Sequence, residues 1–379
     1  LCEEIDPAFI AKTAIYCRKK GLMRDTPALL TAILTVRGPQ YLPAVFDSVI
    51  DNGKMLRTFV QILRSGAVGR KSLGSRPKKL VQSWLLRASE AALLQGAVGN
   101  TPSLGDVVKM VHPAPTEAWQ EAFFAWLIGK PFDMSALPPI TQAFEAYKQD
   151  KTLPVPPVPF QMLTALSLNT AQWSQIARQA PWQMLRMNLN TFARHGVFEE
   201  KGMTTLIAKK LADPVSVSKA RVFPYQLMAA YAALDAIVPS DIREALQVAL
   251  DAALANVPDL PGDVVVCPDV SGSMGSPATG TRKGATSVVR CIDVAALVAA
   301  ALLKKNPKTR VLPFAERVVD VHLNPRDSVM TNAARLSAIG GGGTCCSAPL
   351  ALLNEHRHRA QTVILISDNQ SWIDNRTRG

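Results

Sequence analysis

The sequence contains few histidines, few aromatic residues and no long hydrophobic run. Its 379 residues include five His, and aromatic residues make up 6% of the chain. No uncharged apolar run approaches the roughly 18 residues that a membrane-spanning helix needs, so we expect no membrane partner. Hydrophobic residues reach 48% of the chain, which predicts a folded protein with a mainly aliphatic core.

The cysteines are also few, and their spacing matches no zinc or redox motif. None of the six forms a Cys-x-x-Cys pair, so we predict free thiols in a reducing compartment. No secretory leader opens the sequence, and we therefore expect a cytoplasmic protein. The sequence begins at Leu1 without a Met and stops at Gly379 soon after an apolar strand. We expect truncated ends, with the C-terminal part of the last domain missing.

Motifs of common catalytic sites do not occur. The sequence has neither a Gly-x-Ser-x-Gly nucleophile elbow nor a Walker phosphate-binding loop. A nuclease would need paired carboxylates around two metal ions. Asp269 and Asp368 could imitate such a pair, but their surroundings are rich in hydroxyls and suit one ion. We predict that the chain is not an enzyme.

The first 261 residues are predicted to be almost entirely helical. Segments with a helical period, each of roughly 10 to 20 residues, are separated by Gly and Pro. They cover 7–20, 26–36, 41–50, 54–64, 78–95, 103–111, 116–128, 138–148, 160–167, 171–178, 181–194, 200–211, 224–236 and 240–255. Helices of this length with short breaks favour stacked pairs of the HEAT type, although no strict sequence repeat is visible.

The pattern changes at residues 259–262, Asp-Leu-Pro-Gly. Beyond them apolar strands alternate with helices, which predicts a doubly wound α/β domain. The strands are expected at 263–268, 309–314, 317–322 and 362–367, and the helices near 286–304, 327–337 and 347–356. The predicted organisation is a helical HEAT-like repeat domain, 1–261, followed by an α/β domain, 262–379.

Oxygen-bearing side chains follow the strands of this predicted α/β domain. Asp269, Ser271 and Ser273 follow the first strand, Thr344 ends a run of glycines, and Asp368 ends the last strand. Ligands of open α/β sheets bind outside the carboxyl ends of the strands, and hard cations prefer oxygen ligands. The pattern predicts one divalent cation, Mg²⁺ first, with Mn²⁺ or Ca²⁺ as alternatives. Taken alone, each Asp after a strand is more typical of a helix cap.

The order Asp-x-Ser-x-Ser, Thr, Asp resembles the metal-ion-dependent adhesion site of von Willebrand factor A domains. The resemblance implies that the two Ser and the Thr bind the metal directly or nearly so, while the two Asp act mostly through water. It also implies an open coordination position for an acidic group of a partner. Cys345 stands where we expect an Asp in that family, which removes one nearby carboxylate.

Positive charge is concentrated in one segment of the chain. The formal net charge of +12 favours a polyanionic partner, nucleic acid before anionic membrane. Residues 51–89 contain nine Lys or Arg against a single acidic residue, Asp51, a net charge of +8. An amphipathic helix is predicted at 51–66, and a loop rich in Gly and cations follows at 66–79. Such a segment is suited to phosphate contacts, and a solvated loop between helices is the alternative.

Three stretches resemble the TROVE module of the Ro autoantigen family: 51–80, Met23–Leu30 and Val107–Pro113. A TROVE module followed by a von Willebrand A-like domain is that family's architecture, and the chain resembles a bacterial-type member. The resemblance implies a monomeric ring of HEAT-like helix pairs. It implies that small noncoding Y RNAs bind the basic outer surface and that single-stranded ends of misfolded RNA enter the central hole. It also implies work with an exoribonuclease such as polynucleotide phosphorylase.

The basic segment and the resemblance together give the candidate RNA contacts. They are Lys54, Arg57, Arg64, Arg70, Lys71, Ser72, Arg76, Lys78, Lys79, Lys109 and His112. Arg186 and Arg194, on a second basic helix, are further candidates, with a solvated helix face as the alternative. The main hypothesis is an RNA-binding scaffold in RNA quality control. The alternative is a metal-dependent protein-adhesion module whose helical solenoid binds peptides.

Overall fold

The computed structural model describes residues 4–278, 289–368 and 371. The chain divides into two compact units, 1–168 and 169–379. This division lies within the predicted helical domain, because the helices after residue 168 belong to the same unit as the α/β part. The predicted domain boundary at 261/262 marks a different change, from helix to strand, and stays a prediction.

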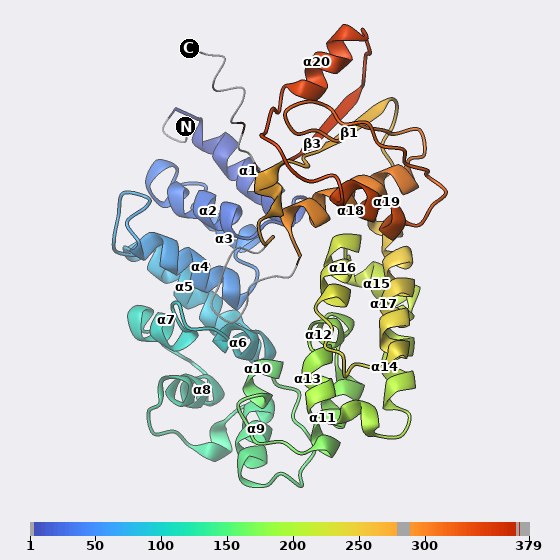
Figure 1. Cartoon of the computed structure of the whole chain (residues 1–379). Helices are drawn as coiled ribbons and strands as arrows, with labels where there is room; N and C mark the ends of the chain where they lie inside the picture. Colours follow the sequence, from blue (N-terminus) through green and yellow to red (C-terminus); the bar gives the residue numbers. More distant parts are fainter. Residues whose placement is uncertain (1–3, 279–288, 369–370, 372–379) are drawn as a thin grey trace. The chain divides into compact units, whose positions relative to one another are not determined.

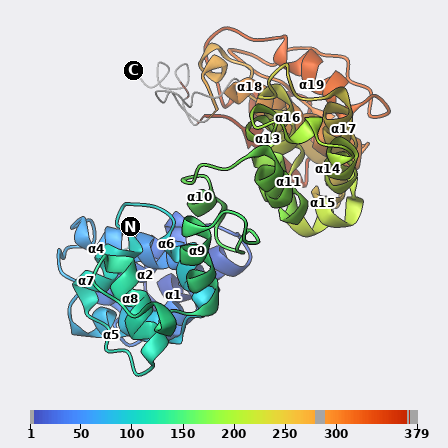
Figure 2. The ribbon, with the colours of Figure 1, turned by 90° about the horizontal axis from the view of Figure 1, so that it is seen from below.

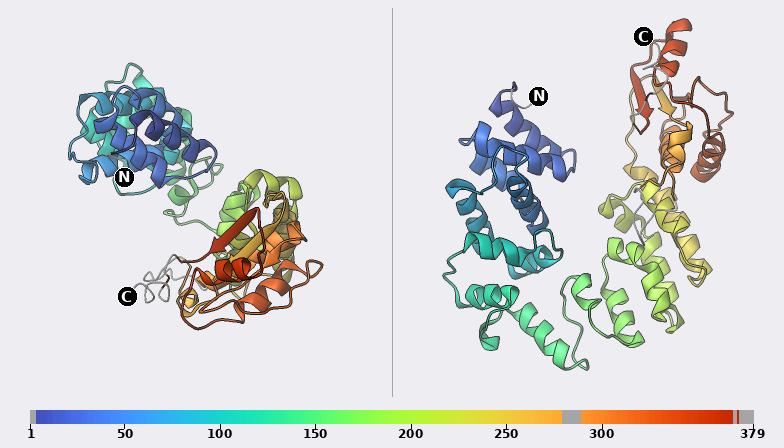
Figure 3. Two further views of the ribbon diagram at one scale, coloured as in Figure 1. Left: turned by 90° about the horizontal axis from the view of Figure 1, so that it is seen from above. Right: turned by 60° about the vertical axis from the view of Figure 1, so that its left-hand side comes forward.

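The first unit is built of helices that follow one another in chain order, from blue to green in the right-hand view of Figure 3. They are α1 (Pro7–Lys19), α2 (Asp25–Arg37), α3 (Leu42–Val49), α4 (Gly53–Arg64), α5 (Ser75–Arg87), α6 (Glu90–Ala97), α7 (Leu104–Val111), α8 (Ala118–Ile128), α9 (Pro139–Gln149) and α10 (Phe160–Leu163), with a 3-10 turn, η1 (Met134–Ala136). Helices α1 and α2 pack as a pair, and so do α7 and α8.

Local caps fix where these helices begin. The Asn52 side chain accepts a hydrogen bond from the backbone N–H of Met55 at the start of α4. Ser103 and Asp106 form a reciprocal capping box at the start of α7. Such caps satisfy backbone N–H groups that have no partner within the helix. Phe46 and Phe59 pack edge to face, with ring centroids 5.3 Å apart, in the core between α3 and α4.

The second unit begins with another helical block. It contains α11 (Thr170–Gln179), α12 (Trp182–Met187), α13 (Leu189–Arg194), α14 (Met203–Ala212), α15 (Pro214–Ala220), α16 (Pro224–Ala232) and α17 (Ser240–Ala253), with 3-10 turns η2 (Val197–Glu199) and η3 (Leu254–Asn256). Within this unit, α16 packs against α18 of the α/β part (Figure 2).

The helix predictions were wrong at three places. The segment 78–95 is two helices, because Ala88 is extended and Ser89 caps α6. The segment 181–194 breaks at Asn188, between α12 and α13. Helix α15 was missed, although Asp213 caps it and Pro214 opens it, a pair typical of helix starts.

The α/β part surrounds a small parallel sheet of order β2-β1-β3 (Figure 1). Its strands are β1 (Val264–Pro268), β2 (Arg310–Val311) and β3 (Thr362–Ile366), and its helices are α18 (Cys291–Lys305), α19 (Val329–Ser337) and α20 (Ala348–Glu355), with a 3-10 turn, η4 (Gly272–Gly275). Together with the helical region before it, this sheet confirms the predicted fold class, helices followed by a von Willebrand A-like α/β domain.

The strand predicted at 317–322 is absent from the described residues. After β2 the chain pairs once more with β1, at Phe314, and then turns back. A single antiparallel bridge joins Phe314 to Val318, and the Ala315 N–H donates to the carbonyl of Arg317 across the turn. The segment therefore forms a tight hairpin beside the carboxyl end of β1, and not a further strand.

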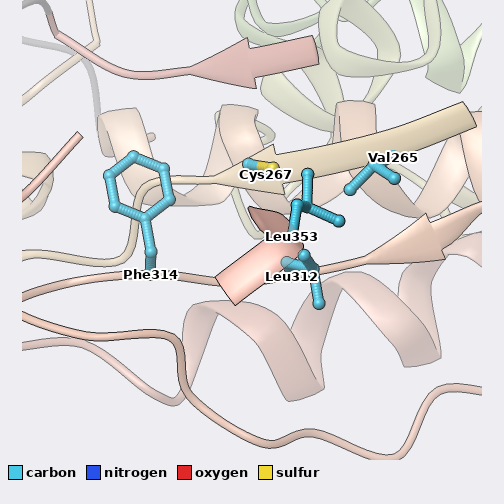
Figure 4. Close-up of a cluster of buried hydrophobic side chains, with 5 residues drawn as sticks. All are labelled: Val265, Cys267, Leu312, Phe314 and Leu353. Atoms are coloured by element: carbon cyan, nitrogen blue, oxygen red, sulfur yellow. The ribbon is translucent and has the colours of Figure 1, made fainter. Parts of the chain in front are cut away.

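The core below the carboxyl ends of the strands is apolar. Val265, Cys267, Leu312, Phe314 and Leu353 pack together and are almost fully buried (Figure 4). Burial raises the pKa of the Cys267 thiol to about 11, because the charged thiolate would lose its hydration. This core fixes the end of β1, from which part of the candidate site projects.

Candidate metal centre and nucleic-acid interface

The carboxylate of Asp269 is held at the end of β1. The backbone N–H of Asp269 donates to the carbonyl of Ile366 on β3, 2.9 Å away, and Asp269 is fully buried. One carboxylate oxygen accepts from the Ser271 N–H at 2.8 Å, and the other accepts from the Ser367 hydroxyl at 2.7 Å. Both oxygens are therefore oriented by neighbours, which suits a role beside the metal and not as its sole ligand.

Three predicted hydroxyl ligands meet next to this carboxylate. The Thr344 hydroxyl donates to the Ser271 hydroxyl at 2.8 Å, and the oxygens of Ser271 and Ser273 are 3.3 Å apart. Mg²⁺ binds oxygen at 2.0–2.1 Å in octahedral geometry, so adjacent ligand oxygens lie roughly 3.0 Å apart. The two hydroxyl spacings, 2.8 and 3.3 Å, lie on either side of this value.

The glycine run before Thr344 lets two backbone segments approach each other. The Gly341 N–H donates to the Val270 carbonyl, and the Gly272 N–H donates to the Gly342 carbonyl, both at 3.0 Å. Gly341 and Gly342 have φ values of +126° and +80°, a region that side chains rarely allow. These glycines are therefore needed to bring Thr344 against Ser271.

Asp368 lies two residues beyond the last paired residue of β3, at the same edge of the sheet. Its charge reaches the Cys291 thiol at the start of α18, where burial first and Asp368 second raise the pKa of that thiol. The structure thus places all five predicted metal residues at the carboxyl ends of β1 and β3 or in the loop beside them. Among the described residues, no three His, Cys, Asp or Glu side chains gather at one point.

Sequence reasoning missed two serines at this site. Ser367 bonds to Asp269 as described, and the Ser371 hydroxyl accepts from the Cys346 N–H at 3.1 Å. Ser367 could have been found, because it lies between β3 and Asp368, in the same position as other strand-end donors. Ser371 carries no pattern that distinguishes it from an ordinary loop serine.

The predicted RNA contact by Arg57 is wrong, because this side chain is buried. Its guanidinium points into the first unit, where it donates to the carbonyls of Val98 at 2.5 Å and Pro102 at 3.1 Å. Only 7% of the residue is exposed, and burial lowers its pKa. Gly99 lies so close to this guanidinium that a side chain at that position would collide with it. Arg57 therefore holds the loop between α6 and α7 and does not face a ligand.

Other arginines of the basic segment are also used in part by the fold. Arg70 donates to the carbonyls of Ser72 and Leu73 within its own loop, and Arg76 donates to the Pro39 carbonyl at 2.7 Å. Arg87 forms an ion pair with Asp47. The segment's own acid is paired as well, because Arg18 binds Asp51 through two nitrogens.

The remaining candidate RNA contacts lie at the surface. Lys54, Arg64, Lys71, Lys79, Lys109, His112 and Ser72 are exposed, and Lys78 is half-buried. In the described part of the chain, no carboxylate forms an ion pair with any of these lysines or with Arg64. Lys54 lies at the opposite end of α4 from Arg64, about 15 Å away along the helix.

Helix α7 contacts both α4 and α5, so four of these residues lie on neighbouring helices or at their ends. The pKa of the Asp106 carboxyl is lowered, first by hydrogen bonds from Ser103 and then by the charges of Lys109 and Arg64. Both cations therefore lie near this carboxyl group. The Gln82 side chain donates to the carbonyls of Val111 at 2.6 Å and His112 at 3.2 Å.

Lys78 lies one turn before Gln82, on the same face of α5. We call Arg64, Lys78, Lys109 and His112 the α4–α7 cation cluster.

The second basic helix divides in the same way. Arg186 donates to the Gln183 side chain and to the Gln226 carbonyl, and burial lowers its pKa. The predicted RNA contact by Arg186 is therefore corrected to a structural role between α12 and α16. Arg194 is exposed, with one bond to the Asn190 carbonyl of its own helix.

Two family models match this chain. One, described as the TROVE domain, matches residues 120–262, and the other, described as the Ro60 vWA domain, matches residues 264–378. The chain belongs to the Ro family. The basic segment 51–89 of this Ro-family chain lies before the range that the TROVE model matches.

Related proteins agree with this assignment. The chain is 24% identical over 297 residues to the RNA-binding protein RO60 of Deinococcus radiodurans, which covers 71% of this chain and 54% of the relative. This Ro-family chain thus spans about half the length of the curated relative that it matches.

The crystal structure of the Deinococcus radiodurans RO (RSR) protein matches with a TM-score of 0.71 and 19% identity, over 97% of this chain and 79% of that one. At this identity the likeness concerns the fold. None of the helices in the described ranges is long and apolar enough to cross a bilayer.

Proposed function

We propose that this Ro-family chain is an RNA-binding scaffold. The α4–α7 cation cluster carries the proposal, because the neighbouring helices α4, α5 and α7 carry its residues and the charges of Arg64 and Lys109 act on one carboxylate, Asp106. Lysine and arginine that neutralise phosphates release counterions, which supplies most of the sequence-independent affinity for nucleic acid. The name of the curated relative, an RNA-binding protein, supports the same ligand class.

The proposed ligand is a small folded noncoding RNA of the Y type, bound through its phosphates. Recognition is mainly of shape, since the deep major groove of duplex RNA is closed to side chains. Single-stranded ends of misfolded RNA are the second ligand, held in the hole of a monomeric ring of helix pairs. A cytoplasmic exoribonuclease such as polynucleotide phosphorylase performs the cleavage in maturation or decay. The resemblance of three sequence stretches to the family supports these details.

A binding experiment with matched variants tests the proposal. The probe is a fluorescent RNA hairpin with a single-stranded 3′ tail, followed by anisotropy across a salt series. The double variant Lys78→Glu/Lys109→Glu should bind at least about tenfold more weakly, with a salt slope reduced by about 2. The control Lys201→Glu/Lys209→Glu changes the net charge equally on exposed positions of the second unit. Equal affinity losses in both variants would contradict a role for the cluster.

A metal-dependent contact with a protein is a second proposed function, favoured by the hydroxyl spacing. The hydroxyls of Ser271, Ser273 and Thr344 would hold Mg²⁺, with Asp269 and Asp368 neutralising its charge through water. A bound cation would supply a Lewis acid that an acidic side chain of a partner protein can complete. Because this site and the cation cluster belong to different units, the two functions are compatible.

Capture of proteins from a cell extract tests the second function. Partners should bind the wild type in Mg²⁺ and leave on chelation, and Asp269→Ala should retain none of them. RNA affinity should be indifferent to the chelator. A set of captured proteins unchanged by both chelator and Asp269→Ala would contradict the metal-dependent contact.

A further inference from the structure

Glu316 lies at the tip of the hairpin that follows β2, beside the metal centre. The Gly343 N–H donates to its carboxylate oxygen at 3.2 Å. Gly343 directly precedes Thr344, the hydroxyl ligand contributed by the glycine run. A side-chain carbon added at Gly342 would lie 3.7 Å from the Glu316 side chain, so hairpin and glycine run are in close contact.

A second bond ties the same two segments together. The Cys345 N–H donates to the Ala315 carbonyl at 2.9 Å. Bonds from Glu316 and Ala315 thus bracket Thr344 on both sides. The hairpin in turn is anchored to β1, because the Val270 N–H donates to the Phe314 carbonyl at 2.9 Å. Glu316 is therefore part of a continuous hydrogen-bonded frame around the hydroxyl group.

The charge of Glu316 is available to the centre. The residue is exposed, and among the described residues no Lys or Arg forms an ion pair with it. The centre itself is rich in neutral hydroxyls, and the Asp269 carboxylate already accepts two hydrogen bonds. Groups that orient the ligands of a metal site change its metal affinity substantially, so a carboxylate bonded to the loop that carries Thr344 is expected to affect cation binding.

We propose that Glu316 is a further residue of the metal centre. Its carboxylate positions the glycine run that carries Thr344, and it adds negative charge beside the cation. The inference rests on the metal-dependent function proposed above. It makes Glu316 a positioning residue, because its contact is with the loop and its charge acts across the site.

Calorimetric titration of the full chain with Mn²⁺ tests this role. Glu316→Ala removes the acceptor and the charge, and it should weaken binding by about 10- to 100-fold, the usual cost of losing an outer-sphere partner. Glu316→Gln keeps an oxygen for the Gly343 N–H and loses the charge, so its affinity should fall between those of Glu316→Ala and the wild type. The difference in Mn²⁺ affinity between Glu316→Gln and the wild type should become smaller at high salt, because salt screens the charge of Glu316.

Controls separate this inference from the metal site itself. Glu355→Gln removes an equal charge from an exposed position at the end of α20, and it should bind Mn²⁺ as the wild type does. If the Glu316 variants and the wild type unfold at the same temperature without metal, misfolding is excluded as the cause of a lower Mn²⁺ affinity. Wild-type affinity in Glu316→Gln would overturn the role of the charge and with it the proposal. If the wild type binds Mn²⁺ no better than Asp269→Asn, the metal site is absent and the inference falls with it.

Discussion

The five predicted metal residues at the strand ends and the cations of the basic segment 51–89 are positioned in opposite ways. Around Asp269 the donors are short side chains, buried and oriented by neighbouring backbone. Around α4 and α5 the cations are long side chains, some of which reach back into the fold, as Arg57 and Arg76 do. A short side chain points where its backbone points, whereas a long one has several rotatable bonds and can find a partner elsewhere.

The position of a short side chain at a strand end is therefore easier to predict than that of a long charged one. All five predicted metal residues lie at one edge of the sheet or in the loop beside it, because the strand ends determine where they project. Of the predicted RNA contacts, Arg57 and Arg186 are structural, since their guanidinium groups bind backbone carbonyls inside the units. A cluster of basic residues in a sequence therefore overestimates the charge that a surface presents. Four predictions test this contrast, in order of expected size.

Loss of the Asp269 charge should have the largest effect, and it should be confined to the metal site. We expect Asp269→Asn to weaken Mn²⁺ binding by about 100-fold, because both a charge and an oriented acceptor beside the ligands change. Calorimetric titration measures this loss, and RNA anisotropy should change less than about twofold. A parallel loss of RNA affinity would show that the two sites are coupled, although they belong to different units.

Replacement of Arg57 should destabilise the first unit more than it affects ligand contacts. In Arg57→Ala the carbonyls of Val98 and Pro102 lose their donors, and we expect a loss of about 2.5 kcal/mol in unfolding free energy. Urea unfolding measures it, with exposed Lys54→Ala as the control, for which we expect a change within about 0.5 kcal/mol. A stable Arg57→Ala protein with weakened RNA binding would instead restore Arg57 to the interface.

Salt should separate the two regions without any substitution. RNA affinity should fall roughly 40-fold between about 50 and 200 mM salt, the slope expected for about three phosphate contacts. Mn²⁺ affinity should fall less over the same range, because buried charges are screened less than exposed ones. The two titrations are run on the same preparation. A flat salt dependence of RNA binding would exclude the cation cluster as its main source.

The smallest effect concerns the buried thiol of Cys267 in β1, two residues before Asp269. The pKa of Cys267 is about 11 in the fold and 9.0 in its unperturbed state, so the unfolded thiol ionises first as the pH rises. Cys267 should contribute no pH dependence below about pH 8, and should lower stability between pH 9 and 11, by up to about 2 kcal/mol. Unfolding midpoints at rising pH should decline less steeply in Cys267→Ala. An equal slope in both proteins would contradict this assignment.

The amino-acid sequence was enough to predict the fold class and the polar residues that follow the ends of the strands. The helical period and the apolar strand runs predict the helices and strands, because the spacing of apolar residues indicates which faces of an element are buried. The absence of the strand predicted at 317–322 could not be foreseen, since the apolar residues of this segment suit a hairpin equally well and only the pairing of Phe314 decides between the two.

The tertiary structure alone decided which cations remain at the surface. Whether Arg57 faces solvent depends on carbonyls 41 and 45 residues away along the chain, which no local pattern contains. The same holds for Glu316, which meets Gly343 across 27 residues. Contacts of this kind form only after distant segments have packed, so they belong to the fold and not to the motif.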